Sequence, residues 1–151
     1  MTEIRYYHLR RTSLEAALPG MLAKTLARGQ RAVVMAGSPE RVEALTAHLW
    51  TYDDRSFLPH GSAADGHAAG QPIWLTIEDE NPNGATTLFL TDGAMSEQIA
   101  DFEHCVILFD GNDAAALAAA RERWAAHKAA GYRLAYFQQS DGGSWEQKAE
   151  A

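Results

Sequence analysis

The sequence is poor in cysteine and has no long apolar run. Its single cysteine among 151 residues, Cys105, cannot form an intramolecular disulfide, and its place in the apolar run 105–109 predicts a buried, reduced thiol. No apolar run approaches the roughly 18 residues that a membrane-spanning helix needs, and the first residues lack the apolar segment of a secretory signal. We therefore expect a cytoplasmic protein that does not associate with membranes.

Basic residues are also scarce. The chain has 13 Lys and Arg against 20 Asp and Glu, and so a formal net charge of −7. This balance opposes strong direct binding to nucleic acid, which needs clustered cations against the phosphate backbone. Segment 112–134 is the exception, because its four basic and two acidic residues give it a net charge of +2 and leave −9 for the remainder. The basic residues of this segment are Arg121, Arg123, Lys128 and Arg133.

The first half of the chain alternates between strand and helix patterns. Residues 4–9 alternate in polarity and predict a strand, and Thr12–Glu15 then forms a capping box that starts a helix. Pro19 lies inside this helix, where it removes a backbone donor and predicts a kink or a restart. Residues 31–36 predict a second, short strand, which a second helix follows to about Trp50.

The second half predicts shorter elements. Residues 61–71 are small and polar, as is typical of a surface loop. Strands are predicted at 72–77 and 85–90, and the turn residues Asn81–Gly84 between them favour an antiparallel pair. The other expected elements are a short helix at 95–102, a central apolar strand at 105–109, a helix at 113–130 and a last strand at 133–137.

The alternation of strands and helices predicts an α/β fold. A chain of this length buries about two thirds of its unfolded surface, which suits a single domain with one core. The strand, glycine turn and capped helix at 31–50 are typical of a doubly wound unit. We therefore expect a Rossmann-like, mostly parallel sheet flanked by helices, with room for an antiparallel hairpin at one edge. This domain is expected to span residues 1–140, with 141–151 as a flexible polar tail.

The turn at Gly37 and Ser38 leaves open an alternative function, that of a small nucleotide-binding α/β enzyme. Phosphate binds well where a strand, a glycine turn and a helix meet, but close approach favours several glycines and Gly37 stands alone here. Asp92 and Asp110 follow strands, where catalytic acids are common, yet neither has a nucleophile elbow or a paired base near it in sequence. We expect no catalytic residue and no cofactor.

Two histidines and three aspartates lie near one another after the second helix. These residue types can bind zinc, but they lack the helical His spacing and the Cys pairs that are typical of zinc sites. We therefore expect no metal. The five residues are His60, His67, Asp53, Asp54 and Asp65.

The basic segment 112–134 places an indole within a charged stripe. Four side chains share a sector roughly 60° wide at about 100° per residue, and Arg123 is expected near the same end. The stripe suits an acidic peptide with an apolar end, because guanidinium groups pair with carboxylates and an indole offers an apolar contact. It equally suits an ordinary amphipathic helix with its indole in the core and its cations at the margin. The four side chains are Leu117, Arg121, Trp124 and Lys128.

Six segments of the chain, taken in order, resemble the chi subunit family of bacterial DNA polymerase III. Each segment is short, but their order and spacing extend over nearly the whole chain. They are Tyr6–Leu9, Leu49–Trp50, Ser56–His60, Leu108–Gly111, Arg121–Leu134 and Tyr136–Gln139.

This resemblance implies a noncatalytic adaptor in DNA replication. It implies that one surface holds the psi subunit, which ties it to the clamp loader, and that another binds the acidic C-terminal tail of single-stranded DNA-binding protein. By position, the psi surface comprises Trp50, Phe57 and Pro59, three apolar residues that could instead belong to the core. The tail surface comprises Arg121 and Trp124, with Lys128 and Arg123.

One position departs from the family pattern. Ala125 follows Trp124 where family members often carry Lys, so Arg123 or Lys128 would have to supply the missing cation. The aromatic surface could also hold a partner other than psi, including a helicase. As a replisome component, the protein is expected to associate with the nucleoid of a bacterial cytoplasm.

Overall fold

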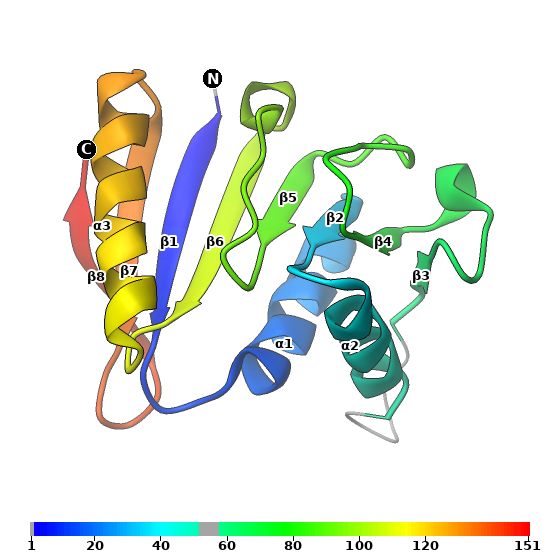
Figure 1. Ribbon diagram of the computed structural model, residues 1–151, viewed down its shortest axis with the longest axis horizontal. Helices are drawn as coiled ribbons and strands as arrows, with labels where there is room; N and C mark the ends of the chain where they lie inside the picture. Colours follow the sequence, from blue (N-terminus) through cyan, green and yellow to red (C-terminus); the bar gives the residue numbers. More distant parts are fainter. Residues whose placement is uncertain (1, 52–57) are drawn as a thin grey trace.

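The computed structural model describes residues 2–51 and 58–151, which are built around one eight-stranded sheet (Figure 1). The strand order is β3-β4-β2-β5-β6-β1-β7-β8, and neighbouring strands are parallel from β3 to β7. The strands are β1 (Glu3–Leu9), β2 (Ala32–Met35), β3 (Gly61–Ser62), β4 (Ile73–Thr76), β5 (Thr87–Leu90), β6 (His104–Asp110), β7 (Arg133–Gln139) and β8 (Trp145–Glu150).

Helices cover both faces of this sheet. Leu18 and Leu22 of α1 (Leu14–Ala27) and Leu45 of α2 (Pro39–Thr51) pack with one face, while Ala120 of α3 (Ala114–Ala129) belongs to a second apolar cluster on the other. Alternate residues of the strands supply the two clusters, because successive side chains of a strand point to opposite faces. The α/β class and the mostly parallel sheet are therefore confirmed, whereas the Rossmann-like assignment stays a prediction.

The apolar strand β6 lies in the middle of the sheet, between β5 and β1, as predicted. Cys105 on this strand is fully buried, and burial raises the pKa of its thiol to about 12. A thiol with such a pKa stays protonated at neutral pH and packs as a small apolar side chain. The predicted buried cysteine is confirmed.

The predicted antiparallel pairing of the strands at 72–77 and 85–90 is wrong. Both strands form, but β4 and β5 lie on opposite sides of β2 and each is parallel to it. Asn81 folds the intervening turn onto itself, since its side chain bonds the backbone N and O of Ala85 at 2.8 and 2.9 Å. Asn83 then ties the connection to the carbonyl of Gln71 at 2.8 Å. The asparagines therefore stabilise a crossover and not a hairpin.

The predicted flexible tail is also wrong. Most of residues 141–151 form β8, which is antiparallel to β7 and provides the antiparallel edge of the sheet. The chain reverses at Gly143, whose φ of 86° lies in the left-handed region that favours glycine. Trp145 then packs edge-on against Tyr7 of β1, with 5.0 Å between the ring centroids. The expected boundary at residue 140 thus falls inside a hairpin.

Two smaller predictions need correction. Pro19 causes no restart, because α1 is one continuous helix whose N-cap Ser13 accepts a hydrogen bond from the Ala16 amide. The helix expected at 95–102 is reduced to the 3-10 turn η2 (Ile99–Asp101). The loop at 61–71 forms largely as expected, although it contains β3 and the 3-10 turn η1 (Ala68–Gly70). No helix among the described residues is both long and apolar enough to cross a bilayer.

Candidate functional site

Helix α3 starts where the sequence predicts and carries the basic stripe along one margin. Asp113 caps it by accepting hydrogen bonds from the amides of Ala115 and Ala116 at 2.9 and 3.3 Å. The many alanines that follow favour helix and leave room for the larger side chains between them. His127 and Lys128 lie in the last turn, where cations complement the helix dipole.

Trp124 is partly buried, with its ring against β1 and β7. Its centroid lies 5.3 Å from that of Tyr6 and 5.8 Å from that of Tyr136, both in edge-to-face geometry. The indole is therefore anchored on one side and reaches solvent on the other. Trp124 is therefore partly a core residue, and its role in docking stays a prediction.

Arg121 and Lys128 flank Trp124 on the solvent side. Both side chains are exposed, and neither makes a hydrogen bond or an ion pair within the part of the chain that the structure describes. The pKa of Tyr136 is raised by burial and partly lowered again by the Arg121 charge, so the guanidinium lies near this hydroxyl. We call Arg121, Trp124 and Lys128 the α3 surface.

Two tyrosine–histidine hydrogen bonds lie beneath the α3 surface. The Tyr6 hydroxyl bonds His127 Nδ1 at 2.6 Å, and the Tyr136 hydroxyl bonds His8 Nδ1 at 2.8 Å. The first bond ties α3 to β1, and the second links the two strands that support the indole. The sequence predicts no site role for Tyr6 or His8, although their spacing of two places them on one face of the strand.

Arg123 points away from the α3 surface, to the opposite margin of the helix. Its Nη2 donates to the carbonyl of Ala94 at 3.0 Å, and its buried Nε has no acceptor among the described residues. Burial lowers the pKa of this guanidinium. The structure therefore does not bring Arg123 together with Arg121 and Trp124.

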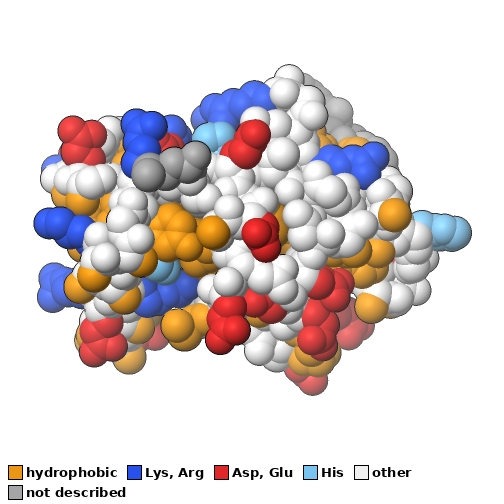
Figure 2. All heavy atoms as spheres, turned by 90° about the horizontal axis from the view of Figure 1, so that it is seen from above, with side chains coloured by type: hydrophobic (Ala, Val, Ile, Leu, Met, Phe, Trp, Pro, Cys, Tyr) orange, Lys and Arg blue, Asp and Glu red, His pale blue; other side chains and the backbone are white. Residues whose placement is uncertain are grey.

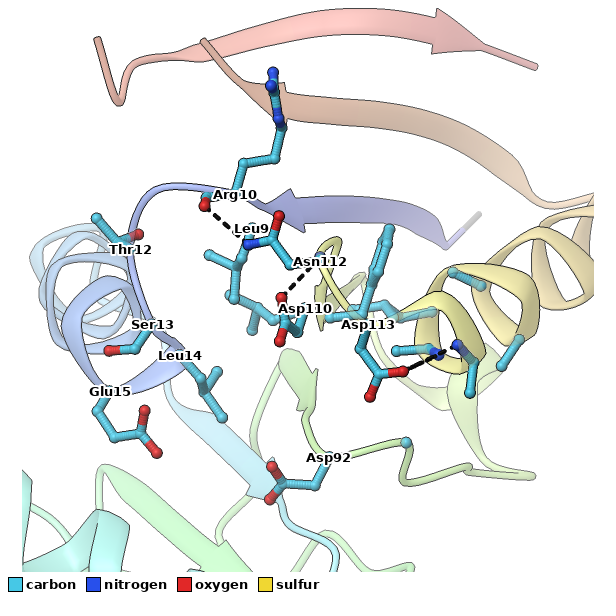
Figure 3. A pocket seen from close by; sticks show the side chains of 18 of the residues that line it. Leu9, Arg10, Thr12, Ser13, Leu14, Glu15, Asp92, Asp110, Asn112 and Asp113 are labelled. Carbon is cyan, nitrogen blue, oxygen red and sulfur yellow. Dashed lines mark hydrogen bonds between the residues drawn. The ribbon is translucent and has the colours of Figure 1, made fainter. Parts of the chain in front are cut away.

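A crevice lies away from the α3 surface, where β1, β5 and β6 end and α1 and α3 begin (Figure 3). Its volume is about 790 Å³, and Figure 3 shows Glu15, Asp92, Asp110 and Asp113 around it. In doubly wound folds this end of the sheet often binds ligands. Here four carboxylates and four arginines line it, and Asp113 already caps the nearest helix.

The Gly37 turn faces one of these carboxylates. The Gly37 amide donates to Asp92 Oδ2 at 3.4 Å, and Arg41 bridges Asp92 and Glu15 at 3.1 and 2.7 Å. Ser38 accepts a hydrogen bond from the Arg41 amide and so acts as a cap. A phosphate at this turn would meet a carboxylate of the chain itself, which disfavours the nucleotide-binding alternative.

Asp110 and the histidines weighed as zinc ligands have hydrogen-bonding roles in the fold. Asp110 accepts a hydrogen bond from the Asn112 amide at 2.9 Å and so stabilises the turn after β6. His60 is buried and bonds the carbonyls of Leu58 and Thr46. Within residues 2–51 and 58–151, no three His, Cys, Asp or Glu side chains are grouped to hold a metal ion. Asp53 and Asp54 lie outside the described residues.

Comparison with known proteins decides the family. A family model described as the DNA polymerase III chi subunit, HolC, matches residues 1–135. The chain belongs to the DNA polymerase III chi subunit family. A probable DNA polymerase III subunit chi from Rickettsia prowazekii (strain Madrid E) is 32% identical over 117 residues, which cover 73% of this chain and 71% of that relative. The family resemblance noted in the sequence is confirmed, and it makes this chain a polymerase III subunit in DNA replication.

The matched region of the chi family ends inside β7, so β8 lies beyond it. The α3 surface lies wholly within the match. Ala125, at the position where the resemblance leads us to expect Lys, is exposed beside Trp124 and adds no cation to this part of the surface.

Two of the three residues expected on the psi surface, Trp50 and Pro59, lie around the end of α2. Trp50 is 56% exposed, and its ring lies 5.1 Å from that of His60. Pro59 is half-buried, beside the buried Leu58. Phe57 falls outside the described residues. The structure thus places Trp50 and Pro59 near the same helix end, well separated in the sheet order from α3.

Proposed function

We propose that this chi-family protein is a noncatalytic adaptor that joins the psi subunit of the clamp loader to the acidic C-terminal tail of single-stranded DNA-binding protein. The observation that carries the tail half of the proposal is the exposed Arg121 guanidinium beside the half-buried Trp124 ring. The psi half rests on the family and on the exposed Trp50 with Pro59 and Phe57 next to it in the chain.

The chemistry of the α3 surface matches a peptide that ends in an aromatic residue and a free carboxylate. Arg121 has an unengaged planar guanidinium that can bind a carboxylate through two parallel hydrogen bonds. Trp124, held by Tyr6 and Tyr136, offers a fixed apolar wall for the terminal aromatic ring. Lys128 adds a second charge about one turn beyond Trp124. These contacts are few and solvent-exposed, so we expect micromolar affinity that falls as salt rises.

Fluorescence anisotropy tests this half of the proposal. The probe is a labelled peptide rich in aspartate that ends in Phe, and the control peptide is a scrambled sequence with the Phe moved inward. We expect Arg121→Glu to weaken binding by more than about tenfold, because a charge-assisted hydrogen bond is replaced by repulsion.

The matched control is Arg28→Glu, which makes the same change of charge at an exposed residue that ends α1 on the other face of the sheet. This variant should bind the peptide almost as the unmodified protein does. Undiminished binding by Arg121→Glu, or equal losses in the two variants, would refute the assigned tail site.

A further inference from the structure

A second elongated surface lies between α2 and the β3–β4 edge of the sheet, at the right of Figure 1. It is a groove of about 780 Å³. One wall is a stripe of α2 that runs from Val42 through Ala47 to Trp50, about 12 Å at the rise of an α-helix. The other wall comes from Leu75 at the end of β4 and from Ile77 just after it. We call this surface the α2 groove.

The α2 groove is open because the outermost strand is too short to cover it. β3 has only two residues, so it pairs with a fraction of β4 and leaves the rest of that edge uncovered. Trp50 is 56% and Ile77 is 41% exposed, although large apolar side chains are usually buried. Paired exposed apolar residues along a groove are typical of an interaction surface.

Every charged residue among the described residues that line the α2 groove is acidic. Four carboxylates come from α2, from the turn after β3 and from the turn after β4, and no Lys, Arg or His is among the described lining residues. None of the four forms an ion pair with a described residue. They are Glu43, Asp65, Glu78 and Glu80.

Two of these carboxylates are held in place by the fold. Glu80 accepts a hydrogen bond from Trp74 Nε1 at 2.8 Å, and Asp65 accepts one from the Ser62 amide at 3.0 Å. The negative rim is thus partly preorganised, which lowers the entropy cost of binding a cation. Acidic side chains also gather at the lower right of Figure 2, on the half of the molecule away from α3.

We propose that the α2 groove binds a cationic amphipathic helix of a partner protein. An apolar floor about two helical turns long receives anchor side chains at i, i+4 and i+7, and the carboxylate rim receives the Lys and Arg residues that flank them. The inference deepens the proposed function and rests on it in one respect, because Trp50 is shared with the surface assigned to psi. The preference for a cationic partner, however, follows from the carboxylates of the groove and does not depend on psi being that partner.

A model peptide tests the proposal on the full-length protein. The probe is a labelled 14-residue helix of Leu and Lys with all leucines on one face, and the second probe has Ser in place of each Leu at the same charge. We expect the Leu peptide to bind more tightly than the Ser peptide. The double variant Glu43→Gln/Glu78→Gln should weaken the Leu peptide by roughly tenfold, at about threefold per exposed charge.

The control double variant is Glu103→Gln/Glu122→Gln, which removes the same charge from exposed residues outside the groove. It should leave binding of the Leu peptide unchanged. Equal losses in both double variants, or equal binding of the Leu and Ser peptides, would overturn the proposal. So would a dimer in sedimentation equilibrium that the groove variant abolishes, since a second copy would then occupy the groove.

Binding assays with the psi subunit distinguish failure of this proposal from failure of the proposed function. If psi fails to bind the unmodified protein while the Leu peptide binds in the groove as expected, the psi assignment fails and the groove proposal stands. If psi binds but neither the peptide nor psi responds to Glu43→Gln/Glu78→Gln, the groove proposal fails and the adaptor function stands. Arg121→Glu should leave binding at the groove unchanged in both assays.

Discussion

The α3 surface and the α2 groove each present a tryptophan near the end of a helix, yet they differ in charge and in depth. Trp124 lies between two tyrosines with free cations beside it, whereas Trp50 is mostly exposed beside free carboxylates. A net charge of −7 therefore conceals two surfaces of opposite sign. The two surfaces differ in sign because each is made on a different face of the sheet, so the partners that we propose for them also differ in charge.

The largest expected effect is a difference in how much each tryptophan contributes to the free energy of unfolding. Trp124→Ala should lower the free energy of unfolding by about 2–4 kcal/mol, because the ring is part of the packing between α3, β1 and β7. Trp50→Ala should lower it by less than about 1 kcal/mol, since most of that ring is already in solvent. Urea unfolding measures both values. Equal losses of unfolding free energy in the two variants would contradict the conclusion that Trp124 is part of the core packing and Trp50 is not.

A smaller expected effect is a pH dependence of stability that comes from the two histidines beneath the α3 surface. Burial lowers the pKa of His127, with a further contribution from Arg123, and burial with the charges of Arg10 and Arg121 lowers that of His8. The folded state therefore favours the neutral rings. Below pH 6.5, the ordinary His value, the unfolded chain takes up protons first, and this contribution to stability is lost as the pH falls through the lowered values.

Urea unfolding at pH 7.5 and pH 5.5 measures this dependence. The free energy of unfolding should be lower at pH 5.5, and His127→Gln should reduce the difference between the two values. An identical pH dependence in both proteins would mean that the bond between Tyr6 and His127 does not couple protonation to folding.

The smallest expected effect concerns the outer cation of the α3 surface. Lys128→Ala should weaken binding of the aspartate-rich, Phe-terminated peptide by roughly two- to threefold, because an exposed lysine contributes little in water. Lys24→Ala is the control, since Lys24 is also an exposed residue in the last turn of a helix. A loss for Lys128→Ala as large as that for Arg121→Glu would show that charge, and not the guanidinium geometry, recognises the peptide.

Most helices and strands follow from local patterns. The start of α3, the apolar run of β6 and the alternation in β1 each depend on a few neighbouring residues, and all three form as predicted. The errors fall where pairing depends on distant segments. Residues Asn81–Gly84 have the sequence of a hairpin turn, but their side chains form hydrogen bonds within a crossover connection. The polar sequence of β8 does not indicate a strand, which forms because β8 pairs with β7 and Trp145 packs against Tyr7.

The candidate site shows the same division. Helical spacing placed Arg121, Trp124 and Lys128 on one stripe, and the structure keeps them on one margin of α3. Spacing could not show that Arg123 bonds the carbonyl of Ala94 on the other margin, or that Tyr136 supports the indole. Both facts depend on which side of the helix meets the sheet.

The amino-acid sequence by itself determined the family, the order of most elements, the buried cysteine and the concentration of positive charge in one helix, because these depend on residue types and short-range spacing. The tertiary structure alone decided which face of that helix is free, how the strands pair and where four scattered carboxylates meet around an apolar groove. The physical reason is that burial and electrostatic fields arise between residues far apart in the chain, and folding alone brings those residues together.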